Sequence, residues 1–214
     1  MKYNKKVFLK EFIIRLKKQY PNTKCSLNYS NDYELLFATI LSAQCTDERV
    51  NKVTEKLFKK YTSIIDFANV PIQELEIDIK STGFFRSKAK SIKESAIKIL
   101  EDFDGKVPNK MEELLKLRGV ARKTANVVLG VYYNIAAGIV VDTHVSRISY
   151  RTGLTKNKNI PKIELDLCKI VPKNNWIIFS HLLIDFGREF CSAPNPKCNN
   201  CFVNDICPKK LDWR

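Results

Sequence analysis

The sequence predicts an all-α protein. Apolar side chains recur at three- and four-residue spacing along nearly the whole chain, and two-residue alternation is almost absent. Glycines and prolines fall mostly between these periodic stretches, where breaks between helices are expected. A chain of 214 residues with 44% hydrophobic and 28% charged residues can form one large or two small globular domains, which excludes a disordered or fibrous protein.

The predicted helices follow one another without a long linker. The first carries Phe8, Phe12 and Leu16, each four residues from the next, and the second is built around Phe37 and Leu41. The later stretches with helical spacing are 46–60, 87–103, 111–117, 121–134, 142–152, 160–171 and 175–190.

Charge indicates the class of partner. The formal net charge is +14, which is typical of proteins that bind a polyanion such as nucleic acid, although a Lys-rich proteome gives the same composition. Residues 1–24 carry eight Lys or Arg and one Glu, either as the solvated face of a helix or as phosphate contacts.

The sequence predicts a cytoplasmic monomer. No stretch approaches the ~18 apolar residues that a membrane span requires, and the N-terminus lacks the apolar core of a secretory signal. We therefore expect no membrane partner. A monomer is expected because no coiled-coil heptads are present.

Four of the seven cysteines lie close together near the C-terminus and predict a metal centre. They have the spacing C-x6-C-x2-C-x5-C and are Cys191, Cys198, Cys201 and Cys207. Four thiolates within so short a segment can close around tetrahedral zinc or a [4Fe–4S] cluster, and spacing alone leaves both open, with a chance grouping of thiols as the third alternative.

Residues 109–130 predict two short helices joined by a tight turn. Asn109 and Glu112 fit a capping box at the start of the first helix. Gly119 interrupts the pattern and can adopt a positive φ, and the free amides at the start of the next helix form a site for a phosphate. This arrangement predicts a DNA contact that does not depend on base sequence.

Two polar residues near this hairpin are candidates for catalysis. Lys123 lies in the first turn of the second helix, where the helix dipole and any burial favour a neutral, nucleophilic amine; the ordinary alternative is a solvated lysine. Asp142 precedes another helical stretch, so it is either a helix N-cap or a carboxylate that activates the lysine. His144 is more simply explained as a packed histidine than as a catalyst.

Five segments in this order resemble the endonuclease III family of DNA base-excision glycosylases. They are 41–47 (LSAQCTD), 81–89 (STGFFRSKA), 122–129 (RKTANVVL), 141–144 (VDTH) and the four cysteines of 191–207. The resemblance implies two helical domains with DNA bound in the cleft between them: a six-helix barrel with the helix-hairpin-helix, 25–135, and a discontinuous iron–sulfur domain, 1–24 and 136–214.

The resemblance also implies a role for each site residue. Lys123 is the nucleophile and Asp142 its partner, Gln44 fills the gap left by an extruded base, and Phe84 enters the duplex where the family usually has Leu. The remaining positions are implied to contact DNA or to ligate a [4Fe–4S] cluster. They are Gly119, Val120, Ala121, Arg122 and Lys197 for DNA, and Cys191, Cys198, Cys201 and Cys207 for the cluster.

The implied function is that of a base-excision repair DNA glycosylase with AP lyase activity. Such an enzyme removes oxidised pyrimidines from double-stranded DNA through a lysine Schiff base and cleaves the strand at the resulting or existing abasic site by β-elimination. In a bacterium it would be associated with the nucleoid. Arg118 and Ala121 depart from the family's hairpin, and we expect DNA binding to be retained, with Arg118 as an added phosphate contact.

Three other functions compete with this one. The adenine-mismatch glycosylase branch shares the fold but generally lacks a lysine at the position of Lys123. A DNA-binding module that recognises lesions without cutting would not need the Lys123 and Asp142 pair. An electron carrier would not need the charge of +14 or a hairpin for phosphate.

Overall fold

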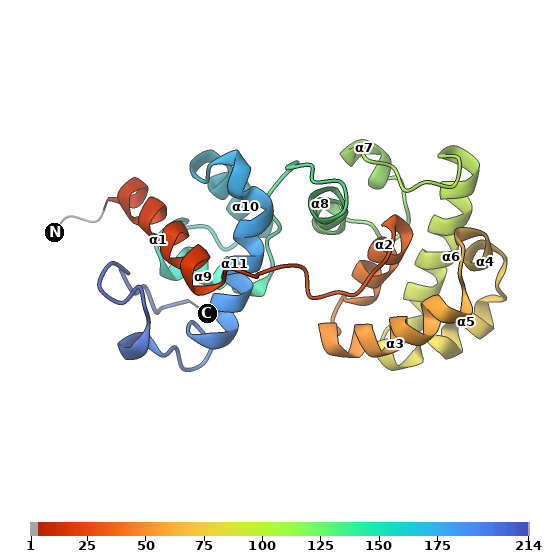
Figure 1. The fold of residues 1–214 in the computed structure, drawn as a ribbon, viewed down its shortest axis with the longest axis horizontal. Coiled ribbons are helices and arrows are strands. Elements are labelled where there is room, and N and C mark those ends of the chain that lie inside the picture. The colour runs from red at the N-terminus through yellow and green to blue at the C-terminus, as the bar shows by residue number, and fades with distance from the viewer. Residues whose placement is uncertain (1–3, 214) are drawn as a thin grey trace. The chain divides into compact units, whose positions relative to one another are not determined.

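The computed structural model describes residues 4–213, which contain helices and no strands (Figure 1). The all-α prediction is confirmed. Packing divides the chain into a terminal unit, residues 1–24 and 138–214, and a central unit, residues 25–137. Residues 1–3 and 214 of the predicted iron–sulfur domain lie outside the described residues. No helix between residues 4 and 213 is long and apolar enough to cross a bilayer.

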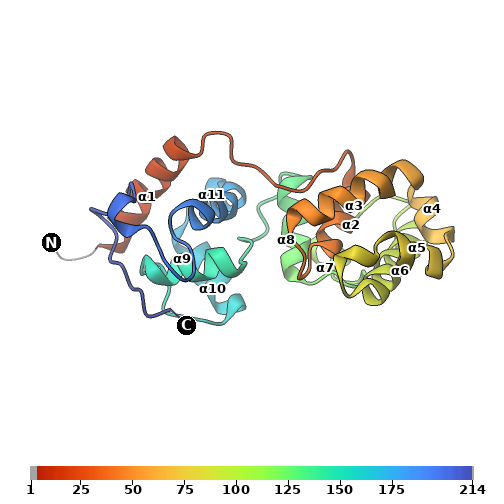
Figure 2. The same cartoon turned by 90° about the horizontal axis from the view of Figure 1, so that it is seen from below.

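The central unit is built around α6, which packs against α4, α5 and α2, while α2 also packs against α3 and α8 (Figures 1 and 2). Its core includes Phe37 and Phe67, whose ring centroids are 4.8 Å apart. The elements are α2 (Asp32–Leu41), α3 (Asp47–Lys60), α4 (Ile64–Asn69), α5 (Ile72–Asp78), the 3₁₀ helix η1 (Lys80–Thr82), α6 (Phe85–Asp102), α7 (Met111–Leu114) and α8 (Arg122–Val131).

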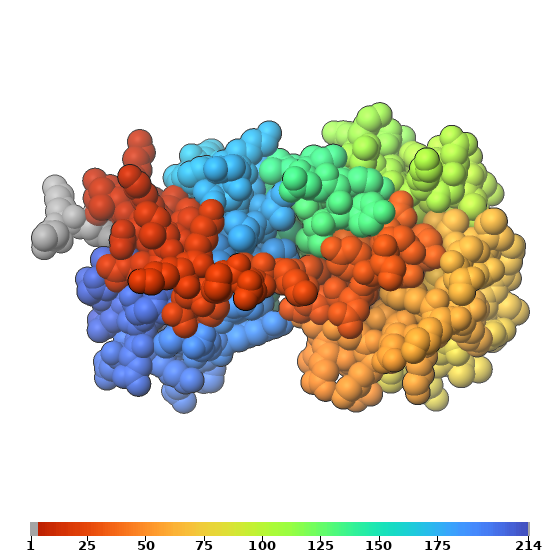
Figure 3. All heavy atoms as spheres, in the orientation of Figure 1, coloured from red at the N-terminus to blue at the C-terminus, as the bar shows by residue number. Residues whose placement is uncertain are grey.

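The terminal unit joins the two ends of the chain. Its core includes Phe12, Phe179 and Phe186, from helices distant in sequence. In Figure 3 the red helix α1 lies against the blue C-terminal segment. The elements are α1 (Lys5–Gln19), α9 (Thr143–Arg151), α10 (Ile160–Ile170), the 3₁₀ helix η2 (Lys173–Asn175), α11 (Trp176–Glu189) and the 3₁₀ helix η3 (Cys198–Asn200).

Several cations of the N-terminal segment bind inside this unit. Arg15 donates to the Phe202 carbonyl at 2.9 Å and to Asp205 at 2.6 Å, and Lys17 donates to Asn175 Oδ1 at 2.6 Å. Part of the positive charge at the N-terminus therefore holds α1 to the C-terminal residues.

Local sequence explains where most helices begin. Asn4 accepts from the backbone amides of Lys6 and Val7 at the start of α1, and Asn31 accepts from the amide of Glu34 at the start of α2. The capping box predicted at Asn109 is wrong, because α7 begins after Lys110 without a side-chain cap. The four-residue α7 is also shorter than the predicted 111–117.

Candidate functional site

The hairpin of the central unit joins α7 to α8 through a turn that requires glycine. Gly119 has a φ of +75°, and a Cβ there would lie 2.7 Å from Ser91 Oγ on α6. Val120 is buried, and Ser95 donates to the Arg118 carbonyl at 3.0 Å, so the turn is packed firmly on α6. Ala121 is the N-cap of α8 and forms no side-chain cap, which suits the first amides of α8 to an external anion.

Arg118, which departs from the family's hairpin, forms a surface ion pair in this structure. Its guanidinium donates to Glu94 of α6 at 3.1 Å, and both side chains are about half exposed. A surface pair of this kind contributes little stability, but it turns the guanidinium toward α6. The departure from the family's hairpin therefore adds an ion pair within the central unit.

Gly119→Ala is expected to destabilise the protein by about 3 kcal/mol, because it combines a strained positive φ with a clash against Ser91. Urea denaturation measures this. Gly105→Ala is the matched control, since Gly105 has a φ of +74° but its Cβ would meet only Leu100, at 3.6 Å. The control should lose about 1 kcal/mol. Equal losses for the two variants would show that the contact with Ser91 has no consequence.

Lys123 lies in the first turn of α8, and its side chain is exposed. The position at a helix N-terminus is as the sequence predicts, and burial does not add to the effect of the helix dipole because the residue is exposed. Exposure leaves the amine accessible to a large substrate. The geometry permits nucleophilic attack on a group that approaches α8 from solvent.

Asp142 is the N-cap of α9 in the terminal unit. Its Oδ1 accepts from the Val145 amide at 2.8 Å, so the prediction that it caps a helix is correct. A carboxylate has a second oxygen, so capping is compatible with a further role. His144 contacts Arg147 at 3.2 Å and packs against Gly187, where a Cβ would come within 2.6 Å of its ring. His144 therefore has a packing role.

Gln44 and Phe84 are exposed at two strained turns of the central unit. Gln44, with a φ of +53°, lies between α2 and α3, and Phe84, with a φ of +47°, immediately precedes α6. The Phe84 side chain is 66% exposed, which is unusual for an aromatic ring. Both residues are exposed and lie outside the core of the central unit.

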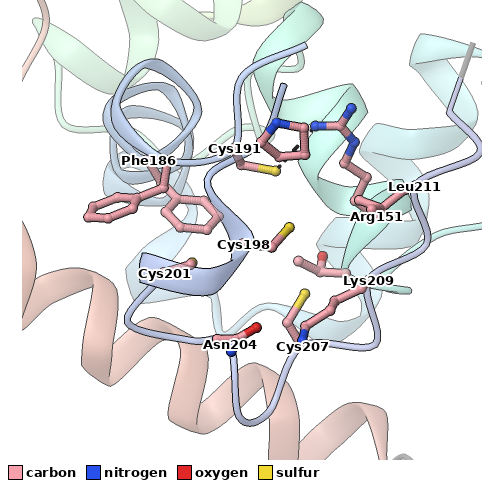
Figure 4. Close-up of a pocket in the computed structure, with 12 residues that line it drawn as sticks. Arg151, Phe186, Cys191, Cys198, Cys201, Asn204, Cys207, Lys209 and Leu211 are labelled. Atoms are coloured by element: carbon pink, nitrogen blue, oxygen red, sulfur yellow. Dashed lines mark hydrogen bonds between the residues drawn. The ribbon is translucent and has the colours of Figure 1, made fainter. Parts of the chain in front are cut away.

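The four clustered cysteines line one pocket in the terminal unit (Figure 4). All four are free thiols. Within residues 4–213, no three His, Cys, Asp or Glu side chains are gathered closely enough to hold a metal ion. Burial raises the pKa of the Cys201 thiol and raises that of Cys207 to about 11, so a metal must displace their protons.

Two buried arginines of α9 hold the start of this cysteine loop. Arg151 donates to the carbonyls of Ser192 at 2.6 Å and Ala193 at 2.8 Å, and contacts Cys191 Sγ at 3.6 Å. Arg147 donates to the Cys191 carbonyl at 3.0 Å. Buried cations require compensation, and an anionic group held by the four thiolates would supply it. The donor set and its charge therefore fit a thiolate-bound metal.

These two arginines were not among the residues predicted from the sequence. The available signal was their spacing of four residues, which places both side chains on one face of the helix. Lys197, in contrast, is exposed in the loop between the first two cysteines, as a residue that contacts DNA must be.

Comparison with known proteins gives the family. The model of the HhH-GPD superfamily of base excision DNA repair proteins matches residues 37–173. The chain belongs to this superfamily. Endonuclease III of Synechocystis sp. is 53% identical over 96% of this chain and 94% of its own length. Endonuclease III of Bacillus subtilis is 47% identical over 88% of this chain and 86% of its own length.

A solved structure is similar to the chain in both fold and sequence. It is a trapped covalent intermediate of an endonuclease III with DNA, with a TM-score of 0.90, 42% sequence identity and coverage of 95% of both chains. Family membership confirms the enzyme class expected from the sequence, a base-excision DNA glycosylase with AP lyase activity.

Proposed function

We propose that this chain excises oxidised pyrimidines from double-stranded DNA and cleaves the strand there or at abasic sites, with Lys123 as the nucleophile. The observation that carries the proposal is the match, over 95% of the chain, to an endonuclease III trapped covalently on DNA. The exposed amine of Lys123 beside the hairpin turn supports this assignment.

In the proposed reaction the neutral amine of Lys123 attacks C1′ of the deoxyribose. The glycosidic bond breaks, and the base leaves after accepting a proton. The sugar ring opens to an imine, which acidifies the C2′ protons; removal of one breaks the C3′–O bond and hence the strand 3′ to the lesion. Water then hydrolyses the imine and releases Lys123.

Asp142 is proposed to accept the proton of the Lys123 ammonium and to stabilise positive charge on the sugar. The capping bond to Val145 fixes the carboxylate at the start of α9.

DNA binding is proposed to use the hairpin and the two exposed turns. The amides of Gly119, Val120, Ala121 and Arg122 would bind a backbone phosphate, as would the side chain of Lys197. Gln44 and Phe84 would enter the duplex and offset part of the stacking lost when a base is extruded. Phenylalanine can stack on a base, so the departure from Leu at this position is compatible with the role.

The four cysteines are proposed to hold a [4Fe–4S] cluster, with Arg147 and Arg151 compensating its negative charge. When bound, the cluster would cross-link the cysteine loop, and it takes part in no step of the reaction. The sequence spacing fits zinc as well, so metal analysis must decide between them. We further propose a monomer that acts in the cytoplasm.

The proposal is tested by borohydride trapping on a duplex with one thymine glycol. Borohydride reduces the imine to a stable amine, so a covalent protein–DNA adduct should appear on a denaturing gel, and peptide mapping should place the link on Lys123. A protein that binds the duplex without forming an adduct would contradict the lysine mechanism and favour a glycosylase without lyase activity.

Asp142→Asn should separate capping from catalysis. Asparagine caps a helix as well as aspartate does, so the thermal midpoint should stay nearly unchanged, whereas loss of the carboxylate should lower the cleavage rate about 10²- to 10³-fold. Asp142→Ala, the comparison variant, should also lose about 1 kcal/mol of stability. Full activity in Asp142→Asn would leave Asp142 with a capping role alone.

A further inference from the structure

Lys88 is a buried cation that the proposed reaction does not use. It lies on α6, its side chain belongs to the core with 5% of the residue exposed, and burial lowers its pKa. Its Nζ donates to two backbone carbonyls, those of Leu41 and Thr82, each at 2.8 Å. Burying an ammonium that has no carboxylate among these partners costs free energy, so the two carbonyls must offset the loss of hydration.

Each acceptor is the last residue of a helix. Leu41 ends α2 and Thr82 ends η1, and terminal carbonyls lack partners within their own helix. The ammonium of Lys88 therefore caps the ends of α2 and η1 at once, and the partial negative charges of the two carbonyl oxygens stabilise its charge. One side chain thus fixes the relative positions of two chain segments that are about forty residues apart.

The two capped ends lead directly into the strained turns described above. Gln44 follows Leu41 by three residues and Phe84 follows Thr82 by two, and both have a positive φ that non-glycine residues rarely adopt. Such a conformation persists only where the surrounding structure determines it. The Lys88 backbone amide donates to the Phe84 carbonyl at 3.1 Å, which is the first backbone bond of α6 and places Phe84 one helical turn before Lys88.

We propose that Lys88 is a positioning residue that ties the turn of Gln44 to the turn of Phe84, so that the two side chains enter the duplex together at one extruded base. The inference rests on the proposed roles of Gln44 and Phe84. Lys88 itself touches no DNA, because its amine is buried against the two carbonyls.

The test is a mutant cycle in single-turnover cleavage of a thymine glycol duplex. Lys88→Met keeps the length of the side chain and removes the hydrogen-bond donors. The side chains of Gln44 and Phe84 should then be misplaced, which should slow cleavage about 10- to 100-fold. Affinity for undamaged duplex should stay within about threefold, because no phosphate contact is lost. Lys88→Arg, which keeps the cation, should restore most of the rate.

Lys93→Met is the matched control. Lys93 lies on the same helix and donates to the Val70 carbonyl at 2.5 Å, far along the chain from either turn. This variant loses a comparable hydrogen bond, so it should lose stability and cleave at nearly the wild-type rate. If Lys88→Met does not fold, Lys88→Gln, which retains an amide donor, takes its place in the cycle.

The decisive variant adds Lys88→Met to Gln44→Ala/Phe84→Ala. If Lys88 acts through Gln44 and Phe84, this triple variant should cleave within about threefold of the double variant. A full additional loss in the triple variant, or a Lys88→Met rate equal to that of Lys93→Met, would overturn the inference. A double variant as fast as wild type would instead remove the proposed roles of Gln44 and Phe84, and this inference with them.

Discussion

Lys123→Gln is expected to abolish strand cleavage and the borohydride adduct while leaving duplex binding intact. Glutamine preserves the approximate length of the side chain but has no nucleophilic amine, so no imine can form. We expect a fall of at least about 10⁴-fold in cleavage, as is usual when a nucleophile is removed. Stability should change little, because the Lys123 side chain is exposed.

The measurement compares filter binding and nicking on the same lesion duplex. Lys116→Gln is the matched control, since Lys116 is another exposed lysine of the hairpin region and its replacement removes the same charge. It should retain the adduct and most of the nicking. Cleavage by pure Lys123→Gln protein at the wild-type rate would assign the nucleophile to another residue.

Cys198→Ser is expected to release the metal and to unfold part of the terminal unit. Serine is a poor ligand for iron or zinc, and if the four cysteines hold a metal as proposed, part of its binding energy is folding energy of the cysteine loop. We expect a loss of at least about 3 kcal/mol in the terminal unit. The central unit has its own core and should unfold near its original temperature.

Iron, sulfide and zinc analysis together with calorimetry checks this expectation. Cys25→Ser is the control, because Cys25 lies in the central unit and outside the pocket. It should keep the full metal content. Wild-type protein that contains zinc and no sulfide would replace the cluster by a zinc site, and normal iron content in Cys198→Ser would remove Cys198 from the ligand set.

The sequence predicted the long helices well. Helical spacing over 46–60 and 87–103 corresponds to α3, Asp47–Lys60, and to α6, Phe85–Asp102. Helices of this length repeat the apolar pattern three times or more, so the period is unmistakable. The sequence analysis did not identify α4 or α5, because helices of six and seven residues span fewer than two turns and show no clear period.

The candidate site divides in the same way. The motif order and the types of Lys123, Asp142 and the four cysteines were sufficient to choose them from the sequence. Other features depend on residues far apart in the chain. Lys88 caps the carbonyls of Leu41 and Thr82, and Ser91 would clash with any Cβ at position 119.

The sequence by itself thus determined the helical class, the chemistry of the candidate residues and the family resemblance, because periodicity and motif spacing are local properties of the chain. The tertiary structure alone decided to which backbone carbonyls each buried cation donates hydrogen bonds. Arg151 could not be assigned to the cysteine loop from the sequence, since forty residues separate it from Cys191 and their contact exists only once α9 packs in the terminal unit. Partners of this kind are chosen by packing, which no local pattern encodes.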